Sequence, residues 1–174
     1  MGFTALAAAE GDDRAAEVAL EFYARVRRLL PDHCAEEIKT IGDALMLRCD
    51  DPGDAVRLGL RIVRELEAVP GFPVARVGVH TGSAVTREGD WYGTTVNVAA
   101  RLCTAAGAGS VLVSEDTCQA AGRLRKIELG ETRLHWLKNL SDPVEARLVS
   151  EARRHCPLTS IHPPRIQLTR TVLP

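Results

Sequence analysis

Apolar side chains recur along the chain with two different periods, and the period separates expected helices from expected strands. Over residues 12–30, DDRAAEVALEFYARVRRLL, they return every three or four positions on one face, which predicts an amphipathic helix. The same period predicts helices over residues 54–69 and 95–106. Ser114 follows a buried strand, and the two acidic residues after it predict the start of a short helix there.

Shorter apolar runs predict strands. Residues 35–41 and 43–49 form two such runs, with Gly42 as the turn between them. VARVGVH, residues 74–80, predicts a third strand, which TGSAVTREGD continues as a hairpin with Gly82 at the turn. Less regular runs predict strands near residues 124–129, 132–137 and 143–149.

The order of these elements defines the expected fold class. Helices and strands interleave, but two tight hairpins exclude a purely parallel βαβ repeat. We therefore expect an α/β sandwich (of the α+β type) with a mostly antiparallel sheet flanked by helices. Residues 1–150 form the expected domain. Residues 151–174 contain four prolines and no sustained period, which predicts an irregular tail.

Composition narrows the class of protein. The 174 residues are 45% hydrophobic and 26% charged, as in globular proteins, and the net charge is −1. This balance gives no reason to expect nucleic acid or a membrane surface as a partner, and no apolar run approaches the roughly 20 residues of a membrane span. The five cysteines are odd in number and lack a C-x-x-C pair, which predicts reduced thiols in the cytoplasm.

Candidate chemistry begins with GDWYGTTVNVAARL, residues 89–102. In a helix that starts near Thr95, Asn97 and Arg101 lie one turn apart on one face. An amide and a guanidinium so placed can bind an anionic oxygen. The spacing alone favours an ordinary solvated helix face.

IKTIGD, residues 38–43, is the second candidate. In an extended strand Lys39 shares a face with Ile41, and Asp43 emerges past the turn. A carboxylate at a hairpin tip can hold Mg²⁺, but this ion normally takes more than one oxygen donor. Taken alone, the segment also fits a plain hairpin with a polar turn.

In combination, these motifs resemble the catalytic domains of class III adenylate and guanylate cyclases. The segments occur in that family's order and spacing over about residues 2–149: GFTAL, IKTIGDALM, VARVGVHTG, GDWYGTTVNVAARL, LVSEDT and LKNLSDPVEARLV. The resemblance implies a ferredoxin-like nucleotide cyclase fold. It also implies conversion of ATP to cyclic AMP and pyrophosphate, two Mg²⁺ or Mn²⁺ ions, and a dimer whose two domains share each active site.

The resemblance also assigns roles to residues. Lys39 and Asp90 match the positions that read the purine, and a Lys–Asp pair is the combination that selects adenine. Asn97 matches the residue that orients the ribose, and Arg101 matches the one that stabilises charge on the phosphate. Asp43 matches the second of two metal-binding aspartates.

Two further phosphate contacts are implied by the resemblance. Gly2, Phe3 and Thr4 match a segment whose backbone N–H groups cradle the phosphates beside a helix start. Lys138 matches a lysine that contacts the triphosphate.

The sequence departs from the family's pattern at its start. The family's first metal aspartate lies three residues before the glycine of GFT, whereas only Met1 precedes Gly2 here. We therefore expect the first, central strand to be missing, which leaves two unpaired strand edges. Either the start codon is mis-assigned or the chain is a truncated relative; we favour the first, because the other site residues are present.

Three hypotheses follow for function. The first is an active adenylate cyclase working as a homodimer, although the chain as given, with one metal aspartate, is expected to be inactive or nearly so. The second is a non-catalytic module that binds a nucleotide, or that pairs with an intact cyclase domain as a heterodimer and lends its purine and phosphate contacts. The third is a fragment that does not fold stably.

Overall fold

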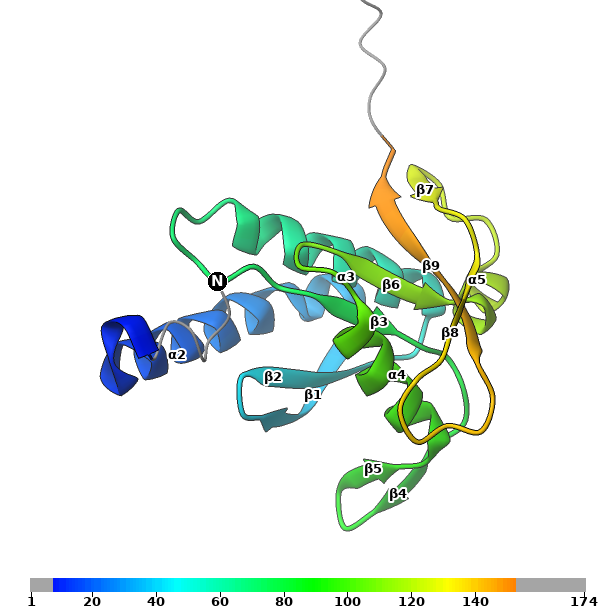
Figure 1. The fold of residues 1–174 in the computed structure, drawn as a ribbon, viewed down its shortest axis with the longest axis horizontal. Coiled ribbons are helices and arrows are strands. Elements are labelled where there is room, and N and C mark those ends of the chain that lie inside the picture. The colour runs from blue at the N-terminus through cyan, green and yellow to red at the C-terminus, as the bar shows by residue number, and fades with distance from the viewer. Residues whose placement is uncertain (1–7, 153–174) are drawn as a thin grey trace, which may run out of the picture.

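The computed structural model describes residues 8–152 (Figure 1). Four helices and nine strands are described in full there, with one short 3-10 helix, η1. In chain order they are α2 (Asp12–Leu29), η1 (Pro31–His33), β1 (Ala35–Ile41), β2 (Ala44–Cys49), α3 (Pro52–Glu67), β3 (Val77–Val79), β4 (Val85–Arg87), β5 (Asp90–Tyr92), α4 (Thr94–Ala105), β6 (Val111–Ser114), α5 (Glu115–Ala121), β7 (Ile127–Leu129), β8 (Arg133–His135) and β9 (Val144–Glu151).

Local sequence signals explain where the helices begin. The Asp51 carboxylate accepts the N–H of Asp54 at 2.8 Å, and Pro52 occupies the first turn of α3. Ser114 caps α5 as predicted, because its hydroxyl accepts the N–H of Thr117 at 3.2 Å. None of the helices within residues 8–152 is both long and apolar enough to cross a membrane.

The strands form one larger sheet and two separate hairpins. The larger sheet has the order β3-β6-β9-β7, with β8 also paired to β9. Its β3–β6 pair is parallel and the other pairs are antiparallel. Strands β1 and β2 form one antiparallel hairpin, and β4 and β5 form the other. The expectation of a mostly antiparallel sheet is confirmed.

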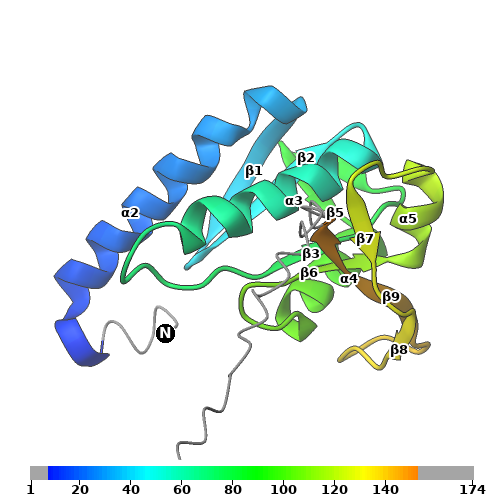
Figure 2. The same ribbon diagram turned by 90° about the horizontal axis from the view of Figure 1, so that it is seen from above.

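Helices cover both faces of the strands, as Figure 2 shows. Helices α3 and α5 pack on one face, where Val56, Val111 and Val113 are almost fully buried. Helix α4 packs on the other face through Val98 and Leu102. Helix α2 closes a third apolar cluster against α3 and the β1–β2 hairpin.

Helix α3 packs against strands of two separate sheets. Leu45 and Leu47 of β2 and Val77 of β3 contact the same apolar cluster as Leu58 and Ile62 of α3. Among residues 8–152, β2 pairs only with β1, and β3 pairs only with β6. One edge of β2 and one edge of β3 are therefore unpaired in this part of the chain.

The second hairpin differs from its prediction, and the expected turn at Gly82 is wrong. The turn lies at Glu88 and Gly89, whose φ angles of 52° and 78° both fall in the left-handed region. Two such residues in succession give a turn whose twist matches paired strands. Gly82 serves close packing instead, since a Cβ there would lie 2.6 Å from Oγ1 of Thr95 in α4.

Other boundaries moved by a few residues. The strand predicted over 74–80 is only Val77–Val79. Strand β9 continues to Glu151, the first residue of the expected tail. The rest of that tail from residue 153, and the phosphate-binding candidates Gly2, Phe3 and Thr4, lie outside the described residues.

Gly78 allows α4 to approach β3 at backbone distance. A Cβ at this position would lie 2.1 Å from the backbone nitrogen of Cys103 and 2.6 Å from the carbonyl oxygen of Ala99. Both atoms belong to the backbone of α4, so no side-chain rotation can relieve the overlap. The position of α4 on the sheet therefore depends on the absence of a side chain at Gly78.

We expect Gly78→Ala to lower the free energy of unfolding by about 3–5 kcal/mol, because β3 and α4 must separate to admit the methyl group. Urea unfolding followed by circular dichroism measures the change. Gly107→Ala is the matched control, since a Cβ there meets only Oγ of Ser110 at 3.5 Å. Equal stability of the two variants would contradict the close-contact explanation.

Candidate active site

A β-bulge in β1 sets the direction of the Lys39 side chain. Glu37 pairs with Leu47, but Lys39 pairs with Met46, so one extra residue, Ile38, is inserted between them. Without the bulge, Lys39 would share the face of Ala35 and Glu37, which lies toward the helices. The insertion moves Lys39 to the opposite face, in the way that bulges re-aim side chains near functional sites.

On that face Lys39 meets Asp90, the first residue of β5. The Lys39 Nζ lies 2.5 Å from the Asp90 Oδ2, and the two side chains are 36% and 26% exposed. The Trp91 backbone N–H donates to the other carboxylate oxygen of Asp90 at 2.7 Å. The hydrogen bond from Lys39, followed by that from Trp91, lowers the pKa of Asp90.

A second contact holds the same two hairpins together. The Arg48 guanidinium of β2 lies over the Trp91 ring, 5.1 Å from its centroid. Arg48 also pairs with Glu36 at 2.7 Å and with Asp50. A cation held by two carboxylates and stacked on an aromatic face fixes the β4–β5 hairpin against the β1–β2 hairpin.

Helix α4 follows β5 directly, with Gly93 as its N-cap. The Val98 and Leu102 side chains face the core, and this leaves Asn97 exposed and Arg101 half-buried at the helix surface. Neither side chain forms a hydrogen bond or ion pair with the described part of the chain. Both polar groups are free to contact a ligand.

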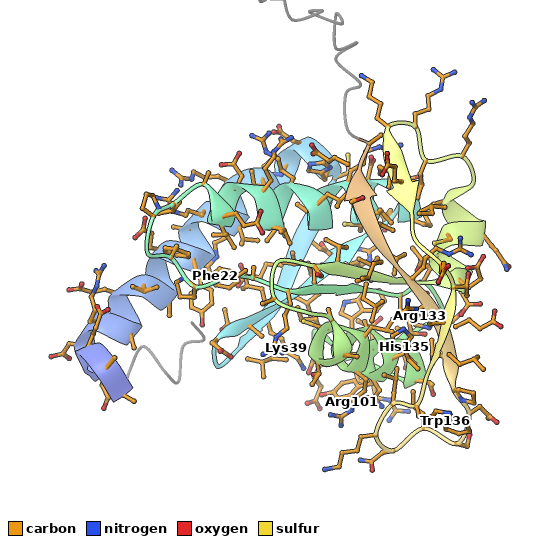
Figure 3. The ribbon with its side chains drawn as sticks, turned by 45° about the horizontal axis from the view of Figure 1, so that its top comes forward. Phe22, Lys39, Arg101, Arg133, His135 and Trp136 are labelled. Atoms are coloured by element: carbon orange, nitrogen blue, oxygen red, sulfur yellow. The ribbon has the colours of Figure 1, made fainter. Side chains whose placement is uncertain are left out.

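Lys138 lies beside α4 because of the residue before it. Leu137 is buried and packs in the same apolar cluster as Val98 and Leu102. Lys138 itself is exposed in the turn that follows, where Asn139 has a φ of 64°. In the view of Figure 3, Lys39, Arg101 and Trp136 lie in this order from left to right. The Trp136 side chain is 76% exposed.

Asp43 lies in the turn between β1 and β2 and is exposed. Gly42, just before it, has a φ of 58°, and its carbonyl accepts the hydroxyl of Tyr23 in α2. Within residues 8–152, no group of three or more His, Cys, Asp or Glu side chains is placed to hold a metal ion. The turn therefore presents one carboxylate.

The structure thus brings some of the predicted residues together and leaves others apart. Lys39 and Asp90 are in direct contact, Asn97 and Arg101 project from α4, and Lys138 follows Leu137, which packs against α4. Within residues 8–152, Asp43 forms no hydrogen bond or ion pair with any of them. The bulge at Ile38 has no glycine or other signal in the sequence, and neither the bulge nor the stacking of Arg48 on Trp91 was predicted.

A separate polar cluster surrounds His80 at the end of β3. The His80 Nδ1 lies 2.8 Å from the Ser114 hydroxyl and 3.8 Å from the Asp116 carboxylate. A cavity of about 360 Å³ opens beside it and is also bordered by Glu115 and Glu145. Burial lowers the pKa of His80, and the charge of Asp116 opposes this effect.

Residues 1–139 match the sequence model of the family described as the adenylate and guanylate cyclase catalytic domain. The match covers most of the chain, and the chain belongs to this family.

Curated relatives agree with this assignment. A pH-sensitive adenylate cyclase of Mycobacterium tuberculosis is 46% identical over 85 residues, which cover 49% of this chain and 21% of that protein. An adenylate cyclase of Streptomyces coelicolor is 34% identical over 125 residues, which cover 72% of this chain and 32% of that protein. The chain thus spans about a fifth to a third of the length of these relatives.

Solved structures share the fold. The adenylyl cyclase CyaB of P. aeruginosa superposes with a TM-score of 0.74 at 22% identity, over 88% of this chain and 90% of that chain. The guanylyl cyclase Cya2 gives a TM-score of 0.75 at 19% identity, over 90% of each chain. An adenylyl cyclase and a guanylyl cyclase therefore share this backbone fold. The fold alone does not distinguish adenine from guanine.

We expect Lys39→Met to raise the pKa of Asp90 toward the usual value of about 3.9, because it removes the main cause of the lowering. Because the pKa of Asp90 is lowered in the folded state, its ionisation stabilises the fold at pH values above the usual pKa. This contribution is lost as the pH falls through the lowered pKa. Carboxyl ¹³C NMR titration measures the shift. Arg48→Met is the control; an equal rise there would contradict the assignment to Lys39.

We expect the protein to lose stability as pH falls below about 6.5, because folded His80 resists the proton that unfolded His80 accepts. His80→Gln should flatten this dependence. Asp116→Asn should steepen it, because it removes the charge that favours protonation. Melting temperatures between about pH 7.5 and about pH 5.5 test both directions; parallel curves for all three proteins would refute the role of His80.

Proposed function

We propose that this chain is the catalytic domain of an adenylate cyclase, which converts ATP to 3′,5′-cyclic AMP and pyrophosphate. Family membership supports the reaction class, and the curated relatives named as adenylate cyclases support the substrate. One observation carries the choice of base: Lys39 and Asp90, 51 residues apart in sequence, meet at 2.5 Å on one accessible surface.

This pair suits adenine by its hydrogen-bonding chemistry. An ammonium only donates, so Lys39 matches a ring nitrogen that accepts a hydrogen bond. An ionised carboxylate only accepts, so Asp90 matches the exocyclic amino group of adenine. Guanine presents a carbonyl oxygen at that position of the ring, which an ionised Asp90 would repel. The lowered pKa of Asp90 keeps the carboxylate ionised at neutral pH.

The proposed reaction is an internal displacement at the α-phosphate. The ribose 3′-oxygen forms a bond to the α-phosphorus, and the bond from that phosphorus to the oxygen bridging to the β-phosphate breaks. Pyrophosphate leaves, and the proton of the 3′-hydroxyl ends on it. Asn97 would orient the ribose, and Arg101 would stabilise the negative charge that develops on the phosphate. Lys138 would contact the triphosphate, as would the backbone of Gly2, Phe3 and Thr4, which lie outside the described residues.

Asp43 fits a role in holding Mg²⁺ or Mn²⁺. It is an exposed, hard oxygen donor at a turn, and Mg²⁺ is commonly held by one or two carboxylates together with substrate phosphates. Such ions neutralise phosphate charge and assist the attacking and leaving oxygens. A two-ion site needs a further carboxylate besides Asp43.

The single carboxylate favours a second candidate function. Within residues 8–152, Asp43 belongs to no cluster of three metal-ligating side chains. A domain with the nucleotide contacts of Lys39, Asp90, Asn97 and Arg101 but without a metal-ligating cluster in its described residues could serve as a non-catalytic nucleotide-binding module. It could also pair with a cyclase domain that keeps both aspartates and lend it Lys39, Asp90 and Arg101.

Both candidates place the functional unit in a dimer, either of two copies or with another cyclase domain. Both also place it in the cytoplasm, where ATP is abundant and thiols stay reduced. The four described cysteines are free thiols, and burial raises the pKa of Cys49 to about 11.

We expect the chain alone to form little cyclic AMP, because Asp43 belongs to no metal-ligating cluster within residues 8–152. Mixed with a cyclase domain that has both metal aspartates, it should form cyclic AMP from ATP with Mn²⁺ faster than cyclic GMP from GTP. Arg101→Ala should lower the rate about 10²–10³-fold, as the loss of other preorganised donors does. Chromatography of the nucleotide products measures both. Arg123→Ala, an exposed arginine in the loop after α5, is the matched control and should keep the parent rate.

The outcomes separate the two candidates. Cyclic AMP from the chain alone supports the first. Cyclic AMP only after mixing with a cyclase domain that has both metal aspartates but lacks its own purine-reading and arginine positions supports the second. No product in either case contradicts the adenylate cyclase proposal.

A further inference from the structure

Strand β5 presents two side chains to Lys39. Alternation along the strand places Asp90 and Tyr92 on one face and Trp91 on the other. The Asp90 carboxylate lies 2.5 Å from the Lys39 Nζ, and the centroid of the Tyr92 ring lies 5.8 Å from the same atom. Trp91 instead stacks on Arg48. Docking of the hairpin and contact with Lys39 therefore involve different aromatic residues.

Tyr92 contacts both members of the purine-reading pair. Its ring attracts the Lys39 ammonium, and its side chain makes the smallest of the contributions that lower the pKa of Asp90, after those of Lys39 and Trp91. Lysine has a flexible four-carbon stem and a compact charge. The Asp90 carboxylate holds the Lys39 ammonium on one side, and the Tyr92 ring limits the other directions in which the ammonium can move.

The exposure of Tyr92 argues against a role in the core. The residue is 52% exposed and belongs to none of the three apolar clusters in the described chain. Its partner across the hairpin, Val85, is also exposed, at 56%. An aromatic side chain held half in solvent, with its contacts directed at Lys39 and Asp90, serves those two residues rather than packing.

We propose that Tyr92 is a positioning residue for base selection, which holds the Lys39 ammonium and the Asp90 carboxylate in the relative position that distinguishes adenine from guanine. The inference rests on the proposed function, because it concerns the same nucleotide site. It predicts that Tyr92 affects the choice between bases and leaves binding of the phosphates unchanged.

The test compares dissociation constants of ATP, GTP and inorganic tripolyphosphate for the full chain, measured by equilibrium dialysis. Tyr92→Leu removes the ring and the hydroxyl, and should reduce the preference for ATP over GTP about two- to fivefold. Tyr92→Phe keeps the ring and should retain most of the preference. Affinity for tripolyphosphate should stay at the parent value in both variants.

Trp91→Leu is the matched control, because it removes an aromatic ring from the same strand but from the opposite face. It should lower the preference for ATP less than Tyr92→Leu does, because it loosens the docking of the hairpin but keeps the contact of Tyr92 with Lys39. An equal loss of preference in Trp91→Leu and Tyr92→Leu would assign selectivity to docking of the hairpin and would overturn the inference.

The results also distinguish failure of this inference from failure of the proposed function on which it rests. If the parent chain binds ATP and GTP equally, or binds neither, the proposed function and the inference fail together. If the parent prefers ATP and Tyr92→Leu keeps that preference, the inference alone fails. Melting curves of all variants show whether each remains folded during the measurement.

Discussion

The contact between β3 and α4 at Gly78 is the constraint on which the site depends. It lets a helix backbone lie directly on a strand backbone, with no side chain between them. Asn97 and Arg101 project from that helix, and Leu102 of the same helix packs with Leu137, the residue before Lys138. A single close approach thereby sets the positions of three polar groups that come from two distant segments of the chain.

The remaining site groups depend on how two hairpins meet. The Lys39–Asp90 and Arg48–Trp91 contacts join β1 and β2 to β5. Each joins a cation of the first hairpin to an anionic or aromatic group of the second, and each is partly exposed to solvent. Association of this kind is weaker than core packing. Lys39 and Asp90 can therefore break their mutual contact and bind a ligand instead.

Much of the fold follows from local patterns. Helical periods located α2, α3 and α4, and the Ser114 cap located α5, because burial and capping act over a few residues. The turn of the second hairpin was misplaced, because Gly82 and Gly89 look alike in sequence while only packing shows which one α4 approaches. The contact of Lys39 with Asp90 was implied by family resemblance; periodicity alone would not have brought together residues so far apart.

Because of the bulge at Ile38, the direction of the Lys39 side chain depends on the number of residues in β1. Side chains alternate strictly along a strand, so inserting or deleting one residue before Lys39 exchanges the faces of every residue beyond it. Lys39 would then point toward α2 and α3, and Thr40 would take its place opposite β5. The proposed capacity to read a purine would thus depend partly on the number of residues in β1, and a change in strand length would abolish it while every site residue is kept.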